Sequence, residues 1–339
     1  MHSHNRALII ANPTAGIGAG RINKQRLIEV ARRDLERGGL QVEVATVSDR
    51  DELSDLAERA VRNKIDYVIA AGGDGTINSV VNGMMRTAQQ PKDAQHRHGE
   101  SRHVEGTALG VLPMGTGNVF AFNLGIANSW REACKVIRQG HTRRIDVGLA
   151  RALARGPQTS ETGHKIHKTR HFLLMAGVGF DAKVVEDTSL RLKFVLRDFA
   201  YVIKSLQNVV LHQGSRVTLT FHSGSVHTAE SWLIMIGNAA SYAWDIKFTS
   251  QARLDDGYLD ICLMPFENKL VSIQQILQIL TGQHVERGIA RYWKTQGVRI
   301  ESNLPVPVQL DGDEWSRTPI EVSLLPAALH VLAPSHTAL

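Results

Sequence analysis

Short apolar runs alternate with amphipathic segments of helical length in the first third of the chain. Residues 7–11 form an apolar run that Asn12-Pro13 ends, and residues 23–37 place apolar side chains on one face and charges on the other. Further strands are expected at 42–44, 67–71 and 109–112, and further helices at 51–61 and 77–85. This alternation predicts an α/β unit built on a parallel sheet.

After about residue 145 the alternation gives way to strand-like runs that are mostly separated by turn residues. These runs lie at 172–175, 217–221, 232–236, 259–264, 298–301, 306–309 and 320–325. Strands with few helices between them predict an antiparallel β domain in the second half. The sequence therefore predicts two domains, with a boundary near residues 140–148.

Three segments fit neither pattern. Residues 89–106 and 155–170 lack apolar periodicity, so we interpret them as solvated loops rather than metal sites. Their histidines (His96, His98, His103, His164 and His167) have no carboxylate or cysteine at ligand spacing. Residues 190–210 are apolar with interleaved basic side chains. A helix packed on the β domain is favoured there over a helix lying on an anionic membrane, because core helices are commoner.

Composition narrows the class of protein. The 339 residues suffice for two domains, and the two cysteines, Cys134 and Cys262, exclude a disulfide framework and a thiolate zinc site. No apolar run approaches the roughly 18 residues of a membrane span, and the N-terminal run is not a signal peptide. The net charge of +6 suits an anionic partner such as phosphate or an acidic membrane surface. We expect a cytoplasmic protein with no nucleic-acid partner.

Three glycine-rich loops follow predicted strands. The first, Asn12-Pro13-Thr14-Ala15-Gly16, matches neither the G-x-G-x-x-G fingerprint nor a P-loop, so alone it is more typical of a turn. The second is Gly72-Gly73-Asp74-Gly75-Thr76, whose glycines let a phosphate approach the backbone. Because the Asp74 carboxylate repels a phosphate, a cation is expected between the two groups. The alternative for it is a tight turn with an aspartate cap. The third is Pro113-Met114-Gly115-Thr116-Gly117-Asn118. Successive strand ends are expected to bring the second and third loops to one crevice.

Together with Ile77 and Asn78, which extend the second loop, these motifs in this order resemble the diacylglycerol kinase catalytic domain family. More narrowly, they resemble its soluble bacterial lipid kinases. Four further motifs continue the resemblance: Arg143-Arg144-Ile145-Asp146-Val147-Gly148, Ala176-Gly177-Val178-Gly179-Phe180-Asp181, Leu254-Asp255-Asp256-Gly257-Tyr258-Leu259-Asp260 and Leu310-Asp311-Gly312-Asp313. The resemblance implies a nucleotide-binding α/β domain at 1–143, a β-sandwich lipid-substrate domain at 144–326 and an ATP site in the cleft between them. Residues 327–339 are expected to form a tail that returns to the first domain.

The activity implied by the resemblance is that of an ATP- and Mg²⁺-dependent lipid kinase. It would transfer the γ-phosphoryl group to a lipid hydroxyl, with diacylglycerol as the default acceptor and a sphingoid base or another glycerolipid as alternatives. Such an enzyme associates peripherally with the inner face of a membrane. The sequence does not decide between a monomer and a homodimer. Two other functions also stay open: an NAD kinase-like enzyme, and a non-catalytic nucleotide- or lipid-binding regulator on the same fold.

The resemblance also assigns nucleotide contacts to individual positions. They fall on Asn12, Pro13, Thr14, Ala15, Gly16, Thr46, Gly72, Gly73, Asp74, Gly75, Thr76, Ile77, Asn78, Gly115, Thr116 and Asn118. A catalytic Mg²⁺ is expected near Asp74 and Asp146. A second, structural Mg²⁺ is expected on the Asp256 side chain and the main-chain carbonyls of Arg253 and Tyr258.

Two positions depart from the family pattern. The general base of the family is a glutamate, and Asp313, one methylene shorter, stands in its place, with Glu314 next to it as the alternative base. Val119 stands where the bacterial lipid kinases usually carry aspartate. Valine cannot ligate a metal, so the second departure removes one carboxylate from the family's metal arrangement.

Overall fold

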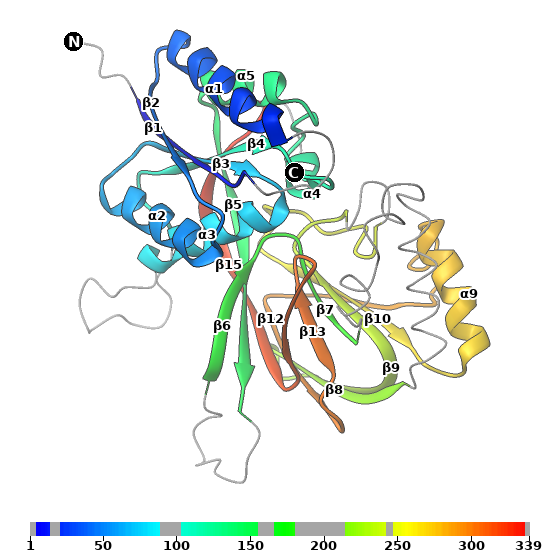
Figure 1. Cartoon of the computed structure of the whole chain (residues 1–339). Helices are drawn as coiled ribbons and strands as arrows, with labels where there is room; N and C mark the ends of the chain where they lie inside the picture. The colour runs from blue at the N-terminus through cyan, green and yellow to red at the C-terminus, as the bar shows by residue number, and fades with distance from the viewer. Residues whose placement is uncertain are drawn as a thin grey trace. The chain divides into compact units, whose positions relative to one another are not determined.

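The computed structural model describes residues 5–13, 21–88, 103–154, 166–179, 214–241 and 247–335. The chain divides into two compact units (Figure 1). The first unit comprises Met1–Val147, Leu254–Gly257 and Leu325–Leu339, and the second comprises Gly148–Arg253 and Tyr258–Leu324. Residues 190–210 lie outside the described residues. In the described ranges, no helix combines the length and the apolar character that crossing a membrane requires.

The first unit is built on a parallel sheet with the strand order β2-β1-β3-β4. These strands are β1 (Arg6–Ala11), β2 (Gln41–Thr46), β3 (Tyr67–Gly72) and β4 (Ala108–Pro113), and the end of β15 (Ile320–Leu332) pairs with β4. The register sets Ala11 opposite both Thr46 and Ala71, and Gly72 opposite Pro113, so all four strands end at one level. The predicted α/β unit with a parallel sheet is confirmed.

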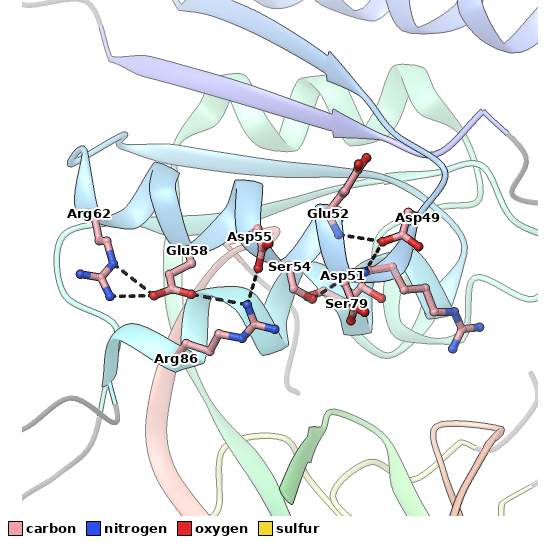
Figure 2. A network of polar contacts seen from close by, with 10 residues as sticks. Asp49, Asp51, Glu52, Ser54, Asp55, Glu58, Arg62, Ser79 and Arg86 are labelled. Atoms are coloured by element: carbon pink, nitrogen blue, oxygen red, sulfur yellow. Dashed lines mark hydrogen bonds and ion pairs between the residues drawn. The ribbon is translucent and has the colours of Figure 1, made fainter.

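Five helices of the first unit are described: α1 (Arg21–Arg37), α2 (Arg50–Arg62), α3 (Asp74–Ala88), α4 (Val119–Asn123) and α5 (Trp130–Gln139). Helices α2 and α3 pack so closely that only glycine fits at position 83. A Cβ there would lie 2.0 Å from the Ser54 carbonyl oxygen. Figure 2 shows the polar contacts beside this approach. The Ser54 hydroxyl donates to the Ser79 carbonyl oxygen (2.8 Å), and the Arg86 guanidinium meets the Asp55 carboxylate at 2.6 Å. The close approach at Gly83 and the buried Ser54–Ser79 hydrogen bond hold α3, whose first residue is Asp74, against α2.

The second unit consists of antiparallel strands and one described helix. The strands are the second half of β5 (Thr142–Leu153), β6 (Ile166–Phe172), β7 (Met175–Val178), β8 (Ser215–Phe221), β9 (Val226–Gly237), β10 (Leu259–Pro265), β11 (Arg291–Thr295), β12 (Gly297–Ser302), β13 (Pro307–Leu310), β14 (Asp313–Arg317) and the start of β15. The helix is α9 (Lys269–Leu280). Every strand pair in this unit is antiparallel among those described, which confirms the predicted fold class.

One continuous core holds the second unit together. It includes Phe172, Leu219, Phe221 and Trp315, all buried. Gly148 of β5 leaves the space that the Phe172 ring occupies, since a Cβ there would lie 2.2 Å from that ring. Burying a large apolar side chain contributes about 1.5–3 kcal/mol, so this cluster is the main source of stability in the unit.

The structure corrects two sequence predictions in this unit. The run at 172–175 is not one strand, because β6 ends at Phe172 and β7 begins at Met175. The main-chain N–H groups of Leu173 and Leu174 turn instead to the carboxylate of Asp311, at 2.8 Å each. The segment 155–170 is not wholly a solvated loop either, since Ile166 onwards forms β6. Helix α9 was not predicted.

His171 of β6 is a buried titratable side chain, with 3% of its surface exposed. Burial lowers the pKa of His171 to about 4, and the positive charge of Arg151 adds to the effect. The ordinary histidine pKa is about 6.5. The folded protein therefore binds a proton at His171 less readily than the unfolded chain does.

We expect the second unit to lose stability as the pH falls from about 6.5 towards 4. In that window the unfolded chain gains a proton at His171 and the folded chain does not, which costs about 3 kcal/mol at the lower end. Urea denaturation at pH 7 and pH 4.5 measures the loss. His171→Gln should show a smaller difference between the two pH values, because the carboxylates that protonate there are common to both proteins. An equal pH dependence in both proteins contradicts the assignment.

Candidate functional site

The loops that leave β1, β2, β3 and β4 share one edge of the first unit's sheet. The Asn12 amide donates to the Ala71 carbonyl oxygen (3.1 Å), and the Met114 amide donates to the Gly72 carbonyl oxygen (2.9 Å). Thr46 is the last residue of β2. The first residues of all three predicted loops are thus brought together at this edge. The remainder of the first loop, Thr14 to Gly16, lies outside the described residues.

The second and third loops touch through their glycines. A Cβ at Gly115 would lie 2.4 Å from the Gly73 Cα, and a Cβ at Gly73 would lie 3.2 Å from the Gly115 Cα. A side chain at position 115 would overlap the Gly73 backbone, so this position requires glycine, whereas a Cβ at position 73 would make a tight contact. Thr116, the residue after Gly115, is exposed.

The residues after the second loop's glycines turn inwards. Thr76, Ile77 and Asn78 are all buried in the first turn of α3. Gly72 gives the Thr76 side chain its space, since a Cβ at Gly72 would lie 2.4 Å from the Thr76 hydroxyl oxygen. These three predicted nucleotide contacts therefore support the loop from within the fold.

Asp74 holds the beginning of α4. Its carboxylate accepts the main-chain N–H groups of Val119 (3.1 Å) and Phe120 (2.9 Å), which are the first two residues of that helix. A carboxylate at a helix N-terminus also interacts favourably with the helix dipole. Position 119 takes part through its main-chain N–H, so valine there preserves this contact with Asp74.

Asn118 fixes the third loop from inside. It adopts a left-handed conformation (φ 51°), and its side chain accepts the Gly115 N–H at 2.8 Å and donates to the Gly115 carbonyl oxygen at 3.0 Å. The same amide donates to Asn128 at 2.8 Å. Asn118 is thus a loop-forming residue with a buried side chain. Asn128 is a supporting residue that sequence reasoning missed.

Asp146 is buried, with 2% of its surface exposed. Its carboxylate accepts the N–H groups of Gly257 and Ala327 at 2.7 Å each, and its own N–H donates to the Leu254 carbonyl oxygen. Burial raises the pKa of Asp146, and the two amide hydrogen bonds oppose that shift. The nearby negative charge of Asp256 raises the pKa further.

The turn that follows Leu254 carries the acidic pair of the predicted structural metal site. Asp255 forms an ion pair with Arg143 at 3.1 Å, and Asp256 is half-buried. Arg253 and Tyr258 flank the turn in the second unit, and both are exposed. Within the described residues, no group of three or more His, Cys, Asp or Glu side chains could hold a metal ion. A site made of one carboxylate and two carbonyls stays a prediction.

The predicted base lies on a hairpin turn of the second unit. Asp311 adopts φ 50°, and its carboxylate accepts three main-chain N–H groups, from Leu173 and Leu174 (2.8 Å each) and Met175 (3.0 Å). This anchored turn leads directly into Asp313 at the start of β14.

The two candidates for the base differ in their surroundings. The Asp313 carboxylate is half-buried and meets the Arg170 guanidinium at 2.9 Å, whereas Glu314 is exposed. Arg170 is a functional candidate that sequence reasoning missed, because it ends a segment with no apolar periodicity. An ion pair of this kind holds the Asp313 carboxylate in one orientation.

Two family models match this chain. Residues 6–150 match the model described as the diacylglycerol kinase catalytic domain. Residues 175–333 match the model described as the YegS C-terminal NAD kinase beta sandwich-like domain.

Individual relatives agree with these models. The chain is 30% identical over 332 residues to diacylglycerol kinases from the RF122 and MRSA252 strains of Staphylococcus aureus, covering 97% of this chain and 93% of theirs. Its fold resembles the crystal structure of a diacylglycerol kinase from Bacillus anthracis, with a TM-score of 0.69, 21% identity and 99% of both chains covered. The chain therefore belongs to the diacylglycerol kinase family, a family of ATP-using lipid kinases.

Proposed function

We propose that the protein is an ATP- and Mg²⁺-dependent kinase that phosphorylates the free hydroxyl of a membrane lipid, with diacylglycerol as the default acceptor. The observation that carries this proposal is the contact between Gly73 and Gly115 at the carboxyl edge of the parallel sheet. Two glycine-rich loops at that edge suit a triphosphate bound through main-chain N–H groups. Family membership supplies the class of acceptor.

Phosphoryl transfer asks a protein mainly to position the reactants and to neutralise developing charge. The N-terminus of α3, a helix of 15 residues, offers main-chain N–H groups and a positive dipole end beside Gly73. Thr116 offers an exposed hydroxyl from the neighbouring loop. We assign the nucleotide phosphates to this part of the first unit.

Asp74 is the residue that we assign to Mg²⁺. Oxygen donors are what Mg²⁺ takes, and an ionised carboxylate can accept about four hydrogen bonds or ligands. The Val119 and Phe120 amides occupy two of these positions and fix the carboxylate. Mg²⁺, when bound, supplies charge neutralisation at the phosphates. Both carboxylate oxygens of Asp146 accept main-chain N–H groups, which favours a positioning role over direct ligation.

Asp313 is the residue that we propose as general base for the acceptor hydroxyl. Arg170 orients its carboxylate, and the Asp311 turn fixes its main chain. The exposed Glu314 lacks any comparable fixed partner among the hydrogen bonds and ion pairs of the described residues. Because the acceptor is a membrane lipid, we place the working enzyme at the inner surface of a membrane as a peripheral protein.

The experiment that tests the function is a transfer assay. Purified full-length protein with γ-labelled ATP, Mg²⁺ and mixed micelles should label diacylglycerol more than sphingoid bases or other glycerolipids. Label in NAD would assign an NAD kinase instead. ATP binding without transfer to any lipid would assign a regulator, and either result overturns the proposal.

Replacing Asp74 tests the contact with α4. Asp74→Ala should abolish turnover and should speed hydrogen exchange of the Val119 and Phe120 amides by about tenfold, because these amides lose an acceptor bond of about 1–2 kcal/mol. Asp55→Ala, which removes an exposed ion pair in the same unit, is the matched control and should leave both readouts nearly unchanged. Unchanged exchange at both amides in Asp74→Ala contradicts the assignment.

The two candidate bases can be separated by single substitutions. Asp313→Asn should lower kcat by about 10²–10⁴-fold, which is the usual contribution of general-base catalysis. Glu314→Gln should keep most of the activity. Steady-state kinetics with diacylglycerol in mixed micelles measures both variants, with circular dichroism as a check on folding. The opposite ranking would move the base to Glu314.

A further inference from the structure

The turn before the proposed base contains two consecutive residues in the left-handed region. Asp311 adopts φ 50° and Gly312 adopts φ 87°, and the residues on either side of them, Leu310 and Asp313, pair with each other in the β13–β14 ladder. A two-residue hairpin turn with positive φ at both positions is the type that favours Asp-Gly. Gly312 lies outside the paired residues, so its N–H has no partner within that ladder.

Gln309 provides the partner that the ladder lacks. Its Oε1 atom accepts the Gly312 N–H at 2.7 Å, and its side chain is buried, with 2% of its surface exposed. Gln309 belongs to β13, the strand that leads into the turn, and it pairs with Glu314 of β14. The hydrogen bond therefore ties the residue before the proposed base to the preceding strand.

The place of the Gln309 side chain depends on a glycine in the neighbouring strand. Gly177 of β7 pairs with Gln309, and a Cβ at Gly177 would lie 2.6 Å from the Gln309 Nε2 atom. Any larger residue at position 177 would displace the end of the Gln309 side chain. Gly177 belongs to the motif at 176–181, to which none of the roles assigned above falls.

The nitrogen of the Gln309 amide is not satisfied in the same way as its oxygen. Nε2 is buried and has no hydrogen-bond partner in the described part of the chain. Leaving a buried donor unpaired costs free energy, and a flexible apolar side chain such as methionine would avoid that cost. The contact that favours glutamine at this position is therefore the one from Oε1 to the Gly312 N–H.

Side chains of β6 hold the other strand of the same hairpin. Lys168 donates to the Trp315 carbonyl oxygen at 2.9 Å, and Arg170 meets the Asp313 carboxylate at 2.9 Å. The β13–β14 register shifts beside Gln309, so Trp315 is an extra residue in β14. Bulges of this kind re-aim side chains and are frequent beside active sites. Asp313 thus lies between a bulge and a turn that are both fixed by side chains of the second unit.

We propose that Gln309 is a positioning residue for Asp313, that it acts through the Gly312 N–H, and that Gly177 gives its side chain the necessary space. The inference rests on the proposed function, in which Asp313 is the general base. A base must lie within hydrogen-bond reach of the hydroxyl that it deprotonates, and a misplacement of about 1 Å costs about 10²-fold in rate. Without the Gln309 bond, the turn holds Asp313 less firmly.

Substitution of Gln309 tests the contact and its effect on catalysis. Gln309→Met removes the acceptor and should lower kcat about 10- to 100-fold, with KM for ATP changed by less than about twofold. Hydrogen exchange of the Gly312 amide should become about tenfold faster. Gln309→Glu should retain most of the activity, because a carboxyl group also accepts the Gly312 N–H. The matched control is Gln275→Met on α9, also 2% exposed and in the same unit, which should leave kcat nearly unchanged.

A double substitution separates positioning from a merely structural role. In the Asp313→Asn background, Gln309→Met should change kcat by less than about twofold, because the group that it positions is already lost. An equal fold loss in both backgrounds would overturn the inference. Gly177→Ala, which displaces the Gln309 amide, should lower kcat about tenfold in the otherwise unchanged protein. Unchanged kcat in Gly177→Ala overturns the inference even if Gln309→Met does not fold.

The outcomes distinguish this inference from the proposed function. Full activity of Gln309→Met, in a protein that phosphorylates a lipid and depends on Asp313, overturns the positioning role and leaves the function intact. A base at Glu314 has the same consequence. A wild-type protein that labels no lipid overturns the function, and the positioning role with it.

Discussion

The common end level of β1, β3 and β4 is the constraint on which the proposed nucleotide site depends. Neighbouring strands of a sheet lie about 4.8 Å apart, so loops that leave β3 and β4 from the same level start almost in contact. Gly73 and Gly115 meet at that point, where a Cβ at position 115 would lie 2.4 Å from the Gly73 Cα. The strand spacing therefore requires glycine at position 115, and we propose that a phosphate approaches the half-buried main chain of the two loops.

Three aspartates stabilise loops in the same way. Asp74, Asp146 and Asp311 each accept two or three main-chain N–H groups from segments that are distant in sequence. Loop amides have no ladder partners, and a carboxylate can satisfy several of them with strong, charge-assisted bonds. The cost is desolvation, which is visible in the raised pKa of Asp146. Aspartates in these motifs thus have an architectural role before any ligand role is added.

The sequence predicts the fold class because its periodicity is local, and it misses features whose causes are distant. The bend at Leu173 depends on Asp311, which is 138 positions away. Arg170 gives no periodic signal, and its partner Asp313 is 143 positions away. Helix α9 was missed because it carries apolar residues on both sides, with Leu270 and Leu277 exposed and Ile276 and Ile279 buried, so no single apolar face stands out. Motif spacing identified the loops at the sheet edge, but not that Thr76 and Asn78 are buried.

Asp146 and its hydrogen-bond partners lie next to the points where the chain passes from one unit to the other. The proposed phosphate loops belong to the first unit and the proposed base, Asp313, to the second, so the proposed transfer draws on both units. The chain passes between the units after Val147, Arg253, Gly257 and Leu324. Asp146 precedes the first passage, and its hydrogen bonds to Leu254, Gly257 and Ala327 fall within three residues of the others.

Through its carboxylate and its main-chain N–H, Asp146 therefore bonds to first-unit residues close to the points where the chain passes between the units. Removing the carboxylate would take the acceptor from the half-buried Gly257 and Ala327 amides, which is a structural change whether or not a metal ion is bound. A loss of activity on replacing Asp146 follows from that change alone. It is thus no evidence for a magnesium ligand, whereas Asp74, fixed on a loop at the open edge of the sheet, keeps lone pairs that a cation can use.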